Sequence, residues 1–379
     1  MITVIDFETS KVPRHLPWTG GYPVCVTLLT GMNTWQLVLN HNENKRNQAD
    51  QIQQIRSILD KTTVLVAHNM KFELAWLNHL GVVRKRELQL WCTRVVEYIV
   101  SGQSLSPRQY DLDSVCRRRG IPVKTDLVQK YWDCDYETDE IPLRILLDYN
   151  LWDCKITQAV YAQQVREVMN EHIIPLVTLS MKELEVLCQI EQNGMLLDLE
   201  HLKREYDINT GRIEQLTEEL RRIAGVDVNP DSPNQLSSLL FGGSYDVGTK
   251  EWVHFKNGNS RERNSKLTIT LPGIFPLNKD MKRGKGGYYS VDKAVISELK
   301  PKTKDQRRIL EIITELSRLQ TLVGTFYGGL LQRQIGGYAH PSMNQTVART
   351  GRLSSSNPNL QNQPRTGEVK RGFTSRYRE

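Results

Sequence analysis

The spacing of hydrophobic residues changes once along the chain, near residue 176, and this change restricts the folds that the chain can adopt. Before it, short runs rich in β-branched residues alternate with stretches of helical spacing. The strand-like runs are Met1–Ile5, Val24–Leu29, Trp35–Leu39 and Val64–Ala67, and the helix-like stretches are Lys71–Leu80 and Leu143–Val168. This alternation predicts an α/β domain, in which a mixed sheet is covered by helices.

After residue 176, apolar side chains recur at intervals of three or four residues. One apolar stripe runs from Ile213 to Ile223, and a second runs from Ile309 to Phe326. This spacing places the apolar side chains on one face of each helix, and such faces become buried when the helices pack together. The second half is therefore predicted to form a mainly helical domain.

A basic insert, residues 242–287, separates these two helical stretches. It is rich in glycine, asparagine, lysine and arginine, and residues 250–287 contain nine basic and three acidic side chains. Such a composition supplies little hydrophobic core. We interpret the insert either as a projecting ribbon, with strands at Trp252–Phe255 and Leu267–Leu271, or as a mobile loop.

The net charge of the chain lies entirely in its second half. The 379 residues, 39% of them hydrophobic, are enough for two or three domains. Residues 1–180 carry 20 basic and 20 acidic groups, whereas residues 181–379 carry 30 and 23, which accounts for the net charge of +7. A polyanion bound by the second half and a solvated basic face both explain this surplus.

The composition also excludes several classes of protein. No run approaches the roughly 18 apolar residues of a membrane span, and Asp6 and Glu8 close to the first residue argue against a secretory signal. We therefore expect no membrane partner and a cytoplasmic location. The six cysteines form no C-x-x-C pair, so neither a zinc site nor a disulfide framework is predicted.

Three stretches place acidic side chains at predicted strand ends or on helix faces. Asp6 and Glu8 are two residues apart in a predicted strand, so their side chains point to the same face. Asn69 and Glu73 follow the point where a strand becomes a helix. Tyr149 is four residues before Asp153 on a predicted helix, and such residues share a helix face. Carboxylates so arranged are either solvated or hold a cation.

These three stretches, in this order, resemble the motifs of the tyrosine-bearing subgroup of the DEDD exonucleases, as found in the proofreading domain of family A DNA polymerases. Asp6 and Glu8 match the first motif, Tyr149 and Asp153 match the third, and the second resembles N-x-x-[FY]-D except that Glu73 replaces the usual aspartate. The resemblance implies a ribonuclease H-like domain that binds two Mg²⁺ or Mn²⁺ ions. The residues so implied are Asp6, Glu8, Glu73 and Asp153 as metal ligands, Tyr149 as the residue that orients water, and Val12, Asn69 and Phe72 as DNA contacts.

The second half resembles the polymerase part of the same family. Residues 350–362 are similar to the run T-G-R-L-S-S-x-x-P-N-L-Q-N, and Asn229–Leu236 resembles the N-x-x-S-P-x-Q-L element of the thumb. The resemblance implies that Arg352 holds the primer terminus and that Gln361 and Asn362 contact DNA. It also implies three domains: an exonuclease domain at 1–175, a thumb-like domain at 176–340, and the start of the palm at 341–379.

From these resemblances we predict a proofreading-type, metal-dependent 3′-to-5′ exodeoxyribonuclease that binds single-stranded 3′ ends and primer–template duplexes. The sequence contains no D-Y-S-x-x-E-like run, so no polymerase activity is expected from this chain alone. Two explanations remain open: the chain is a fragment, or a separate polypeptide supplies palm and fingers. An alternative function is a non-catalytic DNA-binding subunit whose nuclease site is weakened at Glu73. An RNA-trimming nuclease fits the front motifs but not the T-G-R-L-S-S run.

Overall fold

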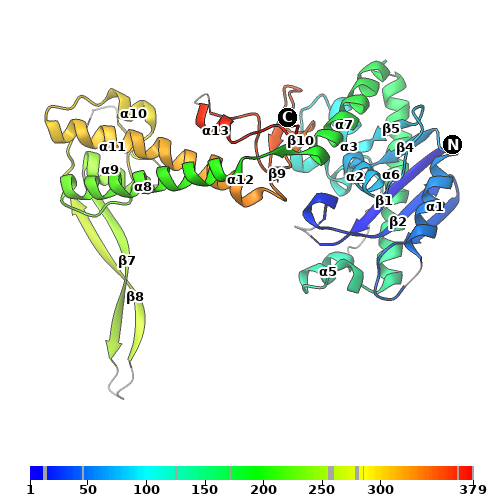
Figure 1. The fold of residues 1–379 in the computed structure, drawn as a ribbon, viewed down its shortest axis with the longest axis horizontal. Helices are drawn as coiled ribbons and strands as arrows, with labels where there is room; N and C mark the ends of the chain where they lie inside the picture. Colours follow the sequence, from blue (N-terminus) through cyan, green and yellow to red (C-terminus); the bar gives the residue numbers. More distant parts are fainter. Residues whose placement is uncertain are drawn as a thin grey trace. The chain divides into compact units, whose positions relative to one another are not determined.

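The computed structural model of the chain (Figure 1) describes all residues except 12–14, 45–46, 124–126, 171, 255–259, 278–280, 285, 365–366 and 378–379. The chain divides into two compact units. The sheet unit comprises residues 1–197, 333–363 and 374–379, and the helical unit comprises residues 198–332 and 364–373. Within the described residues, no helix combines the length and the apolar character that crossing a membrane requires.

A five-stranded mixed sheet forms the centre of the sheet unit. Its strands, in spatial order, are β3 (Asn33–Val38), β2 (Pro23–Thr30), β1 (Ile2–Thr9), β4 (Val64–Ala67) and β5 (Gln89–Cys92). The pairs β1–β2 and β2–β3 are antiparallel, whereas β1–β4 and β4–β5 are parallel. The mixed sheet predicted from the sequence is therefore confirmed, with β5 as an additional strand.

Helices cover both faces of this sheet (Figure 1). They are α1 (Gln48–Leu59), α2 (Met70–His79), α3 (Thr93–Val100), α4 (Leu112–Arg118), α5 (Leu127–Asp133), α6 (Leu143–Asn170) and α7 (Ile174–Asn193). On one face, Ile5 and Phe7 of β1 pack into a core shared with α1, α2 and α7. On the other face, Val4 packs against Cys154 of α6. Because side chains alternate along a strand, the face of β1 that carries Val4 also carries Asp6 and Glu8.

The compact units do not divide at the boundaries 175 and 340 expected from the sequence. Helix α7 belongs to the sheet unit because Val177, Met181 and Leu184 are buried in the same core as α2. Residues 333–363 also join the sheet unit, through three short strands. These are β9 (Tyr338–Ala339), paired with β6 (Met195–Leu196), and the hairpin of β10 (Ser342–Asn344) with β11 (Ser354–Ser356).

Two long antiparallel helices form the helical unit, as the two apolar stripes predict. They are α8 (Leu199–Ala224) and α11 (Lys304–Thr321), whose buried faces meet through side chains such as Leu216 and Ile312. Arg308 bonds both carboxylate oxygens of Glu219 across this pair, at 2.8 and 2.7 Å. The unit also contains α9 (Pro233–Phe241), α10 (Lys293–Glu298), a π-helical turn (Leu322–Tyr327), α12 (Gly328–Arg333) and α13 (Gly367–Arg371).

The basic insert begins with a long two-stranded ribbon, which confirms the first of the two interpretations of this segment. Strand β7 (Gly243–His254) pairs with β8 (Ser260–Leu271) along its whole length without a bulge. The base of the ribbon is fixed by Tyr245, which is buried and whose hydroxyl donates to the carbonyl oxygen of Asp227 at 3.1 Å. In Figure 1 the ribbon extends away from the helices of its own unit.

Candidate functional site

Three carboxylates that are far apart in the sequence meet at the α6 face of the sheet. Asp6 and Glu8 come from β1 and Asp153 comes from α6, and one carboxylate oxygen of each lies within 4.8 Å of the others. The contact between Val4 and Cys154 fixes this arrangement, because it places the next residues of each element beside one another. The convergence expected from the sequence is thus present, and we call these three residues the acidic cluster.

Asn150 is a member of this site that the sequence reasoning missed. It is fully buried, and its Nδ2 donates to Asp6 Oδ2 at 2.6 Å and lies 3.5 Å from Glu8 Oε1. A neutral donor between two carboxylates reduces their repulsion without cancelling their charge. The sequence does contain one indication of this role: Asn150 lies three residues before Asp153, which puts both side chains on the same face of α6.

Glu73 lies in the first turn of α2, close enough to Asp6 for the two side chains to interact electrostatically. Burial, reinforced by the negative charge of Asp6, raises the pKa of Glu73 well above its usual value. Only 3% of the residue is exposed, and its Oε2 has no hydrogen-bond partner among the described residues. A buried, unpaired carboxylate is costly unless a cation compensates it.

The donor set around the acidic cluster suits a hard divalent cation. Mg²⁺ and Mn²⁺ prefer carboxylate oxygens, and the three residues of the acidic cluster offer only such oxygens. The negative potential also reaches the neighbouring thiols. Burial chiefly, and then the nearby acidic groups, raises the pKa values of Cys25 and Cys154 well above their usual range. The residues present therefore fit a divalent cation.

The other predicted residues of the sheet unit lie on α6, in α2 or just before α2, except Val12. Tyr149 lies one turn before Asp153 on α6, half-buried and edge-on to Trp132 at 6.3 Å between ring centroids. Asn69 is exposed at the start of α2, and its side chain makes no capping hydrogen bond. Phe72 stacks on His15 at 6.4 Å. Val12 lies outside the described residues.

His68, which precedes α2, is held by two hydrogen bonds. Its Nε2 lies 2.9 Å from the carbonyl oxygen of Tyr110, so Nε2 carries the proton, and its Nδ1 lies 2.9 Å from the hydroxyl of Thr93. Both ring nitrogens are thus used, as expected for a structural histidine rather than a metal ligand.

We expect His68 to make the sheet unit less stable in acid. Burial lowers the pKa of His68 from 6.5 to about 4. Between these values the unfolded chain binds more protons than the folded chain, so the free energy of unfolding falls as the pH falls, by about 3 kcal/mol over the whole window. Urea unfolding from pH 7 to pH 4 measures this loss. His68→Gln, which cannot titrate, should flatten the dependence, and an equally steep dependence in this variant would contradict the assignment.

The β10–β11 hairpin carries the T-G-R-L-S-S run, whose first four residues lie in the loop between the strands and whose two serines begin β11. This loop is fixed to the sheet unit, because Tyr98 of α3 donates its hydroxyl to the carbonyl oxygen of Ala348 at 2.6 Å and Gln345 Nε2 donates to Glu183 of α7 at 2.7 Å. Arg349 and Arg352 are exposed on the loop, and neither forms an ion pair with any described residue. Gln361 and Asn362, which follow the hairpin, are also exposed.

A buried ion pair, which the sequence did not reveal, joins α2 and α7 to this hairpin. Lys71 of α2 pairs with Glu191 of α7, and both bond the backbone of Met343 in β10, Lys71 at the carbonyl oxygen and Glu191 at the N–H. The side chains of Lys71 and Glu191 are only 17% and 10% exposed. Lys71 occupies a variable position within the Asn69–Glu73 stretch, and nothing in the sequence pairs it with Glu191, so the pair could not be predicted.

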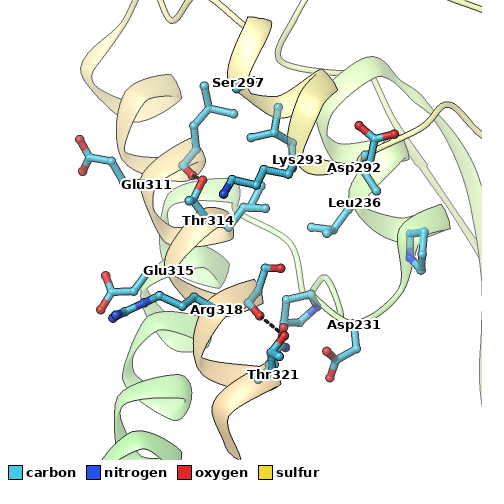
Figure 2. Close-up of a pocket in the computed structure, with 18 of the residues that line it drawn as sticks. Asp231, Leu236, Asp292, Lys293, Ser297, Glu311, Thr314, Glu315, Arg318 and Thr321 are labelled. Carbon is cyan, nitrogen blue, oxygen red and sulfur yellow. Dashed lines mark hydrogen bonds between the residues drawn. The ribbon is translucent and has the colours of Figure 1, made fainter. Parts of the chain in front are cut away.

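The helical unit contains an apolar groove of about 1250 Å³ between α9, α10 and α11 (Figure 2). Leu236 and Ile313 are among its apolar lining residues. Its charged lining residues are of both signs, including Asp292, Lys293 and Arg318. The same unit also brings together His201, Glu205 and Glu368, but His201 Nε2 is bonded to the carbonyl oxygen of Glu368 at 2.9 Å. Neither feature is assigned a ligand.

Comparison with known proteins relates the chain to DNA polymerases. Residues 199–378 match the model of DNA polymerase family A. DNA polymerase I of Borreliella burgdorferi is 23% identical over 83% of this chain and 30% of its own length, and that of Chloroflexus aurantiacus is 32% identical over 51% of this chain and 18% of its own length. The chain thus spans less than a third of the length of these relatives.

A solved structure of the POL domain of Pol1 from M. smegmatis, in complex with DNA primer-template and dNTP, has a similar fold. The TM-score is 0.68 with 18% sequence identity, and the match covers 98% of this chain and 53% of that chain. At this identity the likeness shows the fold alone.

These comparisons contradict the prediction that the chain functions as a 3′-to-5′ exonuclease. The matched family is DNA polymerase family A, and the matched relatives and fold are those of polymerases. The error has a physical reason. Converging carboxylates suit a cation, and a bound cation serves many reactions of nucleic acids, so such carboxylates do not by themselves specify hydrolysis. The alternative of a subunit with a weakened nuclease site rests on the same inference and is dropped with it.

Proposed function

We propose that this chain binds primer–template DNA as part of a polymerase. Residues 199–378 match DNA polymerase family A, and the chain is similar in sequence to DNA polymerase I. The single observation that carries this proposal is the β10–β11 loop, in which Arg349 and Arg352 are exposed on a backbone that is fixed by hydrogen bonds. Guanidinium groups held in this way suit the phosphates and groove edges of a duplex.

The charge of the same region supports this proposal. Residues 349–379 contain seven basic and two acidic side chains, and the charge surplus of the whole chain lies in the half that includes them. Most of the affinity of a protein for DNA comes from neutralising phosphates with lysine and arginine. Gln361 and Asn362, exposed beyond the hairpin, are further candidates for contacts with bases or sugars.

We also propose that Asp6, Glu8 and Asp153, with Glu73 beside them, bind one or two divalent cations, Mg²⁺ or Mn²⁺. The unpaired Oε2 of Glu73 and the purely oxygen donor set support this. A bound cation would offer an attachment point for phosphate oxygens of DNA. Asn150 keeps Asp6 and Glu8 in place for this role by donating to both.

Nucleotide addition needs residues beyond these. The 379 residues contain no D-Y-S-x-x-E-like run, so we expect the chain alone to add no nucleotides. Palm and fingers residues are required to complete a polymerase centre, whether they belong to the same polypeptide or to a separate one.

Arg352→Gln tests the proposed DNA contact. Because the variant loses one phosphate or groove contact, we expect its Kd for a fluorescent primer–template to rise about five- to tenfold. The slope of log affinity against log salt concentration should become shallower by about one. Fluorescence anisotropy across a salt series measures both quantities. The matched control is Arg117→Gln on α4, which also removes an exposed charge. Equal affinities for the two variants would argue against the assignment of Arg352.

A further inference from the structure

We propose that the outer half of the β7–β8 ribbon, residues 248–254 with 260–266, is a second surface that binds the backbone of duplex DNA. This inference rests on the proposed binding of primer–template DNA and adds to it an element outside the T-G-R-L-S-S hairpin. The reach of the ribbon, its lack of a core, its charges and the exposed side chain of Trp252 support it.

The ribbon is long enough to contact a duplex at a distance from the helices that carry it. Its register is unbroken from Gly243 paired with Leu271 to His254 paired with Ser260. At roughly 3.3 Å per residue, twelve residues extend about 35–40 Å. Only the base packs on the helical unit, where Leu271 and Tyr245 lie against α9 and its neighbours.

The outer half has no hydrophobic core of its own. Nearly all of its described side chains are exposed, and polar pairs such as Thr249 with Ser265 bridge the strands, at 2.7 Å between their hydroxyl oxygens. An isolated two-stranded ribbon is only marginally stable in water. A ribbon that persists beyond its packed base therefore gains from a partner that it contacts along its length.

The charges of the outer half favour a polyanion. It carries four basic side chains, Lys250, Arg261, Arg263 and Lys266, and two acidic ones, Glu251 and Glu262. Glu262 is paired with Lys250 across the strands at 2.9 Å, and Lys266 is paired at 3.7 Å with Asp246 of the inner half. Arg263 lies opposite Glu251 in the register, yet it forms no ion pair among the described residues. Since side chains alternate, cations are presented on both faces of the ribbon.

Trp252 adds an exposed aromatic ring to these charged side chains. It is 62% exposed and lies on the same face as Lys250. An exposed aromatic ring beside cations can stack on bases or sugars.

Duplex DNA fits these features better than a protein partner does. A two-stranded ribbon has the dimensions that the major groove admits. A protein interface has a desolvated apolar centre, whereas Trp252 is the one large apolar side chain that is strongly exposed in the described outer half. The ribbon also belongs to the region that matches DNA polymerase family A.

The test neutralises three cations of β8 together, as Arg261→Gln, Arg263→Gln and Lys266→Gln. These positions are exposed, so the fold should be unaffected. The control removes three exposed charges from the sheet unit, as Lys61→Gln, Arg86→Gln and Arg117→Gln. Both variants and the wild type are titrated with primer–templates of about 8 and about 30 base pairs, since at roughly 3.4 Å per base pair only the longer one exceeds the length of the ribbon.

We expect the ribbon variant to bind the longer duplex at least about tenfold more weakly than the control does. Its slope of log affinity against log salt concentration should be shallower by about two to three. On the shorter duplex its Kd should change much less. If the ribbon variant matches the control on both duplexes while Arg352→Gln still weakens binding, the ribbon inference is overturned and the proposed function stands. If the wild type binds neither duplex, both are overturned.

Discussion

Replacing Glu191 by alanine is expected to lower the free energy of unfolding of the sheet unit by about 3–5 kcal/mol, because it leaves the buried ammonium of Lys71 without a counter-charge. The same change removes the acceptor for the N–H of Met343, so β10 loses its attachment to α7. Burial raises the pKa of Glu191 despite the nearby Lys71, which shows how strongly the site is desolvated. Urea unfolding of the full chain, followed by tryptophan fluorescence, measures the loss.

Asp113→Ala provides the control, in an ion pair of the same unit that is exposed on both sides. Asp113 pairs with Arg117 at 3.3 Å, and the two side chains are 47% and 64% exposed, so its loss should cost no more than about 1 kcal/mol. The double variant Lys71→Met with Glu191→Ala should recover part of the stability, because it removes the stranded charge. Equal losses for Glu191→Ala and Asp113→Ala would contradict the view that the buried pair anchors the hairpin.

The second large effect concerns the acidic cluster. Asp153→Asn should weaken binding of Mn²⁺ by more than about 100-fold, because it removes one of the three carboxylates that we propose as ligands. The wild type should also gain thermal stability when the cation is added, by about 2.7 kcal/mol at a concentration 100 times its Kd, and the variant should lose most of this gain. Calorimetric titration gives the affinity and thermal unfolding gives the gain in stability.

Asp148→Asn is the matched control for this experiment, because Asp148 lies on the same helix with its side chain 73% exposed. It should bind Mn²⁺ as the wild type does. A wild type whose unfolding does not respond to Mg²⁺ or Mn²⁺ would rule out the proposed cation site and would leave the burial of Glu73 to be explained by its packing alone.

The parts of this structure that could be predicted from sequence are those governed by short periodicities. The spacing of two between Asp6 and Glu8 gave their common face, and the spacing of four between Tyr149 and Asp153 gave theirs. Because each of these pairs is local, the pattern does not depend on the rest of the fold. The convergence of β1 with α6 followed from the resemblance to a family and is present in the structure.

The parts that could not be predicted depend on contacts between distant elements. Helical spacing in α7 does not tell which core the helix enters, and Met181 and Leu184 join the core of the sheet. Asn150 and Glu191 are ordinary polar residues in helices until tertiary structure buries them. The predicted exonuclease function was wrong for a related reason, since the geometry of possible ligands identifies a site but not the reaction that occurs there.

The most direct measurement of the central claim is a titration of a fluorescent primer–template with the wild-type chain over a range of salt concentrations. We predict saturable binding whose affinity falls steeply and linearly on logarithmic scales as salt is raised, because Arg349, Arg352 and their neighbours neutralise several phosphates. Absence of saturable binding even at the lowest salt concentration would contradict the account.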